Sequence, residues 1–244
     1  GLGVYIGHQF DKGLGGFLNP ISVAEQERIQ GAFFNAVFSL LGHLAKSDGR
    51  ISKSEIAQAE ALMDKMGVSG DHRREAIELF QVGAKAQYSL DKAMERFMAV
   101  CGRHNNLKRQ LLNYLISLAL ADGELHDREH AVLRKVAMHL GFSINMFDQF
   151  IEMVKAQSQF RGLHACSGRL SKDQLADAYR ALGVSSEDSD SQIKRAYRKL
   201  VSQNHPDKLI AKGVPEDMIK LATARAQEIQ AAYEMIKKTR PDIR

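Results

Sequence analysis

The chain has 244 residues, 44% of them hydrophobic, which is enough to bury a core and to form two small domains. Its 34 basic and 29 acidic residues nearly balance, and no recognition motif accompanies the small basic excess, so we expect no nucleic-acid partner. Only 4 prolines, no tryptophan and long stretches of straight-chain helix formers predict an all-α protein.

Residues 1–24 form a glycine-rich apolar leader. Gly3 and Gly7 lie four residues apart, a spacing that lets transmembrane helices approach closely. The chain contains no run of about 20 apolar residues, which is the length that a membrane span requires. The leader is therefore either the tail of a removed transmembrane span or a flexible segment, and both interpretations stay open.

An internal duplication follows in residues 25–156, where apolar residues recur at helical spacing. The segment Leu44–Glu55 recurs as Leu118–Glu129, so that the Asp-Gly pair ending in Gly49 corresponds to the pair ending in Gly123. This pattern predicts a duplicated helix-turn-helix unit in which each glycine adopts a positive φ at the turn.

The repeats share part of the frame of a calcium-binding loop, since Gly49 and Glu55 fall at its sixth and twelfth positions. A calcium loop also needs oxygen ligands at its first and third positions. Here Leu44 and Lys46 occupy those positions, and the second repeat also has leucines there. We therefore predict no calcium site.

Other combinations of metal-binding residues are incomplete. His126 and His130 lie four residues apart, but no third ligand at suitable spacing accompanies them, so we interpret both as surface histidines. Cys101 and Cys166 lack the paired spacing of a zinc site or a disulfide scaffold. We expect neither a metal nor a cofactor.

At these repeats, the segment Glu25–Ala156 resembles the TerB-like family of helical domains, whose repeats carry an Ala-Asp-Gly turn followed by an acidic residue. Some members of that family bind metal through acidic residues. The absence of acids at Lys46 and Leu120 argues against such a role here. After this segment, residues 157–172 lose helical periodicity and gain Gly and Ser, which predicts a linker.

Residues 173–244 predict a short helix that ends at Gly183, and then a second helix with N-cap candidates at Ser189–Ser191. On the second helix Ile193 and Leu200 belong to one buried face. The remaining surface carries a basic ridge made of four cations, Lys194, Arg195, Arg198 and Lys199.

The second helix is predicted to end at Asn204, where His205, Pro206 and Asp207 open a polar loop. We predict that this loop lasts until Pro215, the first residue of a long final helix. Arg225 is the one polar interruption of that helix's apolar face. The pattern predicts an antiparallel helix pair with a charged loop at its tip.

The order of Tyr179–Val184, Ile193–Leu200, His205–Lys208 and Ala226–Glu234 closely resembles the J-domain of the DnaJ family. The resemblance implies that the His-Pro-Asp tripeptide contacts a DnaK-type seventy-kilodalton heat-shock chaperone at its interdomain linker and stimulates ATP hydrolysis. It also implies that the basic ridge docks on an acidic surface of that partner. No catalytic residue is expected on this chain.

The J-domain is C-terminal here, and the chain lacks the Gly/Phe-rich stretch and the Cys-x-x-Cys zinc region of the broadly client-binding members. This order, together with the loop Lys208–Met218, resembles the membrane-anchored DjlA type of bacterial co-chaperone. The resemblance implies a single span in the inner membrane, both domains in the cytoplasm, and a homodimer formed through the glycine-rich span. The alternative is a membrane-associated interaction or stress-response scaffold whose TerB-like domain carries the main activity.

Overall fold

The computed structural model describes residues 22–47, 49, 53–121, 123, 125–163 and 172–240. These residues form eleven α-helices and one 3-10 helix without any strand, which confirms the predicted all-α fold. Seven helices belong to the N-terminal part: α1 (Val23–Ala45), α2 (Lys53–Met66), α3 (Gly70–Gly83), α4 (Leu90–Cys101), α5 (Asn105–Ala119), α6 (Asp127–His139) and α7 (Ile144–Leu163).

Helix α1 lies at the centre of the N-terminal part, with α3, α4 and α5 packed around it. Ser22 is its N-cap and accepts a hydrogen bond from the backbone N–H of Glu25 at 3.2 Å. Phe33 and Phe38 are completely buried, and Phe33 packs edge-on against Tyr114 of α5 with ring centroids 6.2 Å apart. The apolar stripe predicted for α1 is therefore the middle of the core.

The two predicted Asp-Gly turns are confirmed at their glycines. Gly49 has φ of 116° and Gly123 has φ of 96°, a region that L-residues with a side chain rarely adopt. Each turn links two helices of one repeat, α1 to α2 and α5 to α6. The aspartates before these glycines lie outside the described residues.

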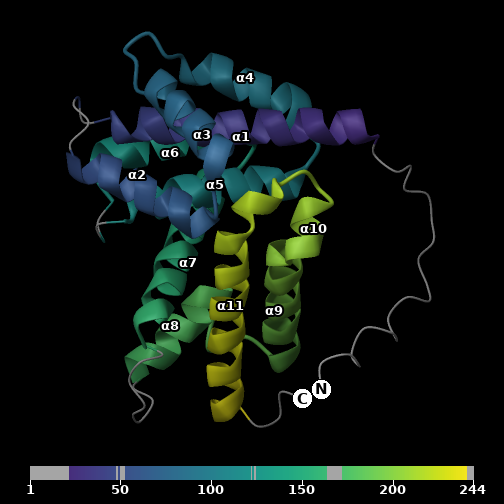
Figure 1. Cartoon of the computed structure of the whole chain (residues 1–244). Helices are drawn as coiled ribbons and strands as arrows, with labels where there is room; N and C mark the ends of the chain where they lie inside the picture. Colours follow the sequence, from purple (N-terminus) through teal and green to yellow (C-terminus); the bar gives the residue numbers. More distant parts are fainter. Residues whose placement is uncertain are drawn as a thin grey trace.

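The C-terminal part contains α8 (Lys172–Leu182), α9 (Asp190–Asn204), α10 (Pro206–Ile210), η1 (Glu216–Met218) and α11 (Lys220–Thr239). Helices α9 and α11 stand side by side with α8 near their lower ends, and α10 lies close to the N-terminal helices (Figure 1). Tyr197 of α9 stacks on Tyr233 of α11 with ring centroids 3.9 Å apart. The predicted antiparallel helix pair is thus formed by α9 and α11.

Two predicted boundaries are wrong. Helix α7 continues to Leu163, so the linker begins later than residue 157. Gln157 is buried and donates a hydrogen bond to the carbonyl of Ala181 at 2.9 Å, which ties this part of α7 to α8. The final helix begins at Lys220 and not at Pro215. A 3-10 turn intervenes, in which the backbone N–H of Met218 bonds to the carbonyl of Pro215.

Within the part of the chain that the structure describes, the buried apolar residues form two clusters, and the larger one is shared between the N-terminal and C-terminal parts. It combines the N-terminal helices with residues that follow the His-Pro-Asp tripeptide, namely Leu209, Val214, Met218, Ile219, Leu221 and Ala222. The smaller cluster holds α8, α9 and α11 together and includes Ala156 of α7. The J-domain-like part is therefore packed against the N-terminal helices through both clusters.

Candidate partner-binding surface

Helix α9 starts where the sequence predicts. Its N-cap Ser189 and the side chain of Gln192 form a capping box: the Ser189 N–H donates to Gln192 Oε1 at 2.8 Å, and the Gln192 N–H donates to Ser189 Oγ at 3.4 Å. Ile193 and Leu200 are buried beneath the helix. This burial fixes which side of α9 remains available to a partner.

The predicted basic ridge lies on that remaining side. Arg195, Arg198 and Lys199 are exposed and Lys194 is half-buried. At 3.6 residues per turn these four positions span about 140° of the helix circumference, so they form one continuous surface. The structure thus brings the four cations together.

A cleft of about 720 Å³ between α7 and α9 borders one side of the ridge. Lys199 lines it from α9, while Asp148 and Glu152 line it from α7. Arg109 and Arg180 line the same cleft, so its walls carry charges of both signs. Lys199 thus borders both the ridge and this cleft.

The His-Pro-Asp tripeptide forms the corner between α9 and α10. His205 has extended backbone angles, φ −69° and ψ 125°, and Pro206 is the first residue of α10. The side chains of His205 and Asp207 are 47% and 87% exposed, and His205 Nδ1 lies 3.9 Å from Asp207 Oδ2, too far for a hydrogen bond. Both polar side chains are therefore available to a partner.

The rest of the predicted polar loop is different from our expectation, because much of it is buried. The short helix α10 occupies its first part, and Leu209, Val214 and Met218 have no exposed surface. Gly213, with φ of 97°, lies so close to Ile29 of α1 that a Cβ there would collide with the isoleucine side chain. The apolar residues of this segment pack on the N-terminal helices. The sequence alone predicted one charged loop and did not reveal this packing.

Polar residues that sequence reasoning missed connect the same region to α5. The Tyr114 hydroxyl donates to the carbonyl of Met218 at 2.8 Å, and the Arg225 guanidinium donates to Asn113 Oδ1 and Ser117 Oγ, both at 2.6 Å. The signal available in the sequence was Arg225 itself, a charged residue at a core position of the final helix.

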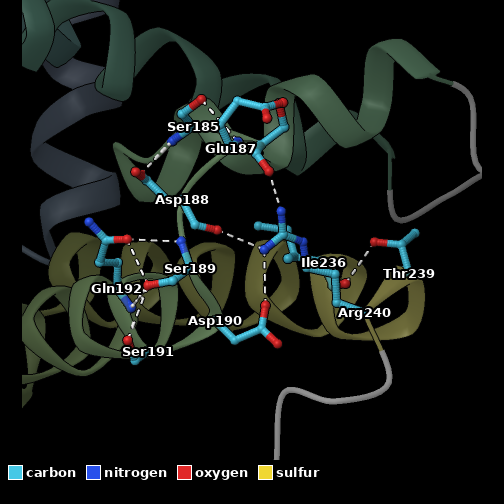
Figure 2. A network of polar contacts seen from close by, with 11 residues as sticks. Ser185, Glu187, Asp188, Ser189, Asp190, Ser191, Gln192, Ile236, Thr239 and Arg240 are labelled. Carbon is cyan, nitrogen blue, oxygen red and sulfur yellow. Dashed lines mark hydrogen bonds and ion pairs between the residues drawn. The ribbon is translucent and has the colours of Figure 1, made fainter.

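A second polar network ties the far end of α11 to the loop between α8 and α9 (Figure 2). The Arg240 guanidinium donates to the carbonyl of Asp188 at 2.8 Å and to Asp190 Oδ1 at 2.9 Å, and it also bonds to the carbonyl of Ser186. The hydrogen bond with Asp190 raises the pKa of Arg240 above its ordinary value. This network fixes the N-terminal end of α9, opposite to the tripeptide.

In the described part of the chain, no group of three or more His, Cys, Asp or Glu side chains is placed so that it could hold a metal ion. His130 lies against the ring of Phe147, with its Nε2 4.0 Å from Asp148 Oδ1. Cys101 is buried, and Cys166 lies outside the described residues. Of the two histidines, His130 therefore packs against a neighbouring aromatic ring.

Nearly all of the leader predicted for residues 1–24 lies outside the described residues, which begin at Ser22. Among the helices that the structure describes, none combines the length and the apolar character needed to cross a bilayer.

Comparisons with known proteins agree with both predicted domain types. The family model described as tellurite resistance protein TerB matches residues 34–151, and the DnaJ domain model matches residues 177–242. Co-chaperone protein DjlA of Shewanella oneidensis is 40% identical over 237 residues, which cover 97% of this chain and 89% of that protein. DjlA of Escherichia coli strain K12 is 43% identical over 243 residues, with the same two coverages. No solved structure matches the chain.

Proposed function

This chain belongs to the DjlA family of co-chaperones, and on that basis we propose that it binds a DnaK-type seventy-kilodalton heat-shock chaperone and stimulates its ATPase. The observation that carries the proposal is the exposed tripeptide with His205 and Asp207 at the end of the basic ridge. ATP hydrolysis takes place on the partner, so the chain itself needs neither a catalytic residue nor a cofactor.

The ridge and the tripeptide have separate tasks in this proposal. The cations of α9 attract an acidic surface of the partner, which speeds encounter and sets the register of the complex. The tripeptide then makes contacts that are stronger with the hydrolysis-competent conformation of the partner than with its inactive conformation. Such differential contacts shift the partner's conformational equilibrium, which is how a protein without catalytic groups accelerates a reaction elsewhere.

The test is a steady-state ATPase assay with the purified partner chaperone. The wild-type chain should raise the ATP turnover, and His205→Gln should bring it back to the unstimulated rate because the tripeptide loses its histidine. His139→Gln is the matched control, since His139 is paired with Asp91 on α4, away from the tip. Equal stimulation by wild type and His205→Gln would overturn the proposal.

The rival scaffold hypothesis assigns the main activity to the TerB-like domain. Deleting that domain cannot separate the two hypotheses, because Leu209 and Met218 would lose their share of the common core. His205→Gln in the full chain separates them. If every measurable function of the protein survives this substitution, the scaffold hypothesis is favoured.

We further propose that the full-length protein is anchored in the bacterial inner membrane by a single N-terminal span, with both domains in the cytoplasm, and that it forms a homodimer through this span. The spacing of Gly3 and Gly7 supports the proposal, because small residues four apart suit helix contacts in a bilayer. Carbonate-resistant sedimentation of the full-length protein with membranes is expected. Replacing both glycines with leucine should reduce cross-linking between copies, and unchanged cross-linking would contradict the dimer.

A further inference from the structure

The segment that follows the tripeptide is built into the N-terminal domain. Leu209, Val214 and Met218 have no exposed surface, and they belong to the same apolar cluster as Ile29 of α1 and Leu107 of α5. A segment packed this way cannot move without exposing apolar surface from both parts of the chain. The position of the tripeptide is therefore coupled to the position of α1 and α5.

Two side chains of α5 contact the segments that come before and after the tripeptide. Before it, the buried Gln110 amide nitrogen lies 3.4 Å from Oδ1 of Asn204, the residue next to His205. Beyond α10, at the end of η1, the carbonyl of Met218 accepts a hydrogen bond from the Tyr114 hydroxyl at 2.8 Å. A single helix of the TerB-like domain thus contacts the chain on either side of the corner that contains the tripeptide.

The buried Arg225 adds a charged connection between α11 and α5. Arg225 is 6% exposed, and its guanidinium donates to Asn113 and Ser117, one helical turn apart on α5. A buried guanidinium requires such acceptors, because leaving its donors without partners is costly. This requirement fixes the distance and the register between α11 and α5.

The interface supports the tripeptide without covering it. The side chains of Asp207 and His205 are 87% and 47% exposed, whereas Asn204, directly before the tripeptide, and Leu209, beyond the exposed Lys208, are buried. An inhibitory contact would bury the polar groups that a partner needs. The observed pattern of buried flanks and exposed tip is that of a support.

We propose that the TerB-like domain acts in cis as the frame of the J-domain, and that Gln110, Tyr114 and Arg225 are positioning residues which hold the His-Pro-Asp tripeptide in its stimulating geometry. This inference rests on the proposed function. It assigns to the N-terminal domain a direct part in chaperone stimulation, which neither family resemblance assigns.

The experiment measures the partner's ATPase rate at increasing concentrations of the full chain. Tyr114→Phe removes one hydroxyl and leaves the ring that packs on Phe33. We expect the plateau of stimulation to fall about threefold to tenfold, the size expected for loss of one buried hydrogen bond. The concentration that gives half of the plateau should stay within about twofold, because the basic ridge on α9 is unchanged.

This split between plateau and half-saturation separates positioning from plain destabilisation. A variant that is only less folded supplies less active protein, so its half-saturating concentration rises while its plateau stays that of wild type. Tyr88→Phe is the matched control, since it removes a hydroxyl that donates to Ser39 Oγ at 2.9 Å within the N-terminal domain. Its plateau should equal that of wild type.

A second variant, Ser117→Ala, removes one acceptor of Arg225 and should lower the plateau in the same way. Wild-type plateaus for both Tyr114→Phe and Ser117→Ala would overturn the inference, while loss of stimulation in His205→Gln would leave the proposed function standing. If wild type itself fails to stimulate the partner, the proposed function is the part that fails, and the inference falls with it.

Discussion

Pro206 restricts the histidine before it and starts the helix after it. A residue that precedes proline is confined to extended backbone, which His205 adopts, and Asp207 follows within the first turn of α10. The tripeptide is thereby a stiff corner with exposed polar groups. A stiff corner loses little conformational entropy when a partner binds, which favours a short contact that must act on another protein's equilibrium.

Substitution of Arg198 tests whether the basic ridge docks on an acidic surface of the chaperone. Arg198→Glu should weaken association with the chaperone about tenfold at ~0.1 M salt, because it replaces attraction to an acidic surface with repulsion. Titration calorimetry at low and high salt measures the effect, which should shrink as salt increases. Arg134→Glu, at an exposed position of α6, is the control and should leave the affinity unchanged. An unchanged affinity for Arg198→Glu would argue against docking through the ridge.

Cys101 provides a test of the core. It is completely buried, and burial raises the pKa of its thiol to about 12. At pH 8 the native thiol is therefore protonated and unreactive, since the thiolate is the nucleophile. The thiol of the unfolded chain ionises at about pH 8.5. The stabilisation that arises from the raised pKa of Cys101 is therefore complete below that pH, and it is lost as the pH rises towards the pKa of the folded protein.

Iodoacetamide labelling at pH 8, read for the peptide that contains Cys101, is the measurement. The native protein should stay unlabelled at this residue, and the protein in urea should be labelled. Equal labelling in both states would mean that α4 does not seal the residue against α1, where its sulfur lies 3.8 Å from the carbonyl of Ile29.

Sequence reasoning identified the tripeptide and the ridge because both belong to one short segment with a helical period around it. It missed Tyr114 and Asn113 because their partners lie more than a hundred residues away along the chain, and one sequence does not pair distant polar residues. Arg225 carried a usable signal. A charged residue at the apolar face of a helix requires buried acceptors, so it points to a second surface packed on that helix.

At the scale of elements, α9 is fixed at both ends, by the capping box with the Arg240 network at its start and by the α5 contacts at its finish. Helical spacing predicted α8, α9 and most of α11 correctly. The start of α11 could not be predicted, because the 3-10 turn before it forms where Met218 and Ile219 enter a core supplied mainly by another domain. The linker was misplaced for a similar reason, since Gln157 looks like a linker residue until its partner on α8 is known.

Arg240→Ala should lower the free energy of unfolding by about 1–3 kcal/mol, because it removes hydrogen bonds from a charged donor to two carbonyls and to Asp190. The free energy of unfolding of Arg240→Lys should lie between those of the wild type and Arg240→Ala, since a single ammonium cannot reproduce the planar fork of donors. Urea unfolding followed by circular dichroism measures both. Lys237→Ala, exposed on the same end of α11, is the control, and a loss as large in the control would show that the network has no special role.

Helix α5 lies where the two parts of the chain meet, and residues on nearly every side of it are buried, from Leu107 to Ala119. A surface helix has one apolar stripe, whereas a helix that is apolar all round lies between other layers. Here α1 packs against it from the N-terminal domain, while Met218 and Arg225 contact it from the J-domain. The sequence showed the long apolar run of α5 but not that a second domain covers it.

The most direct test of the central claim is a hydrogen-exchange footprint of the intact chain with and without the ATP-bound DnaK-type chaperone. Exchange should slow at the corner around His205 and Asp207 and along α9, and it should not change in α2, α3 and α4. A footprint confined to those N-terminal helices, with exchange around His205 unaltered, would contradict that claim.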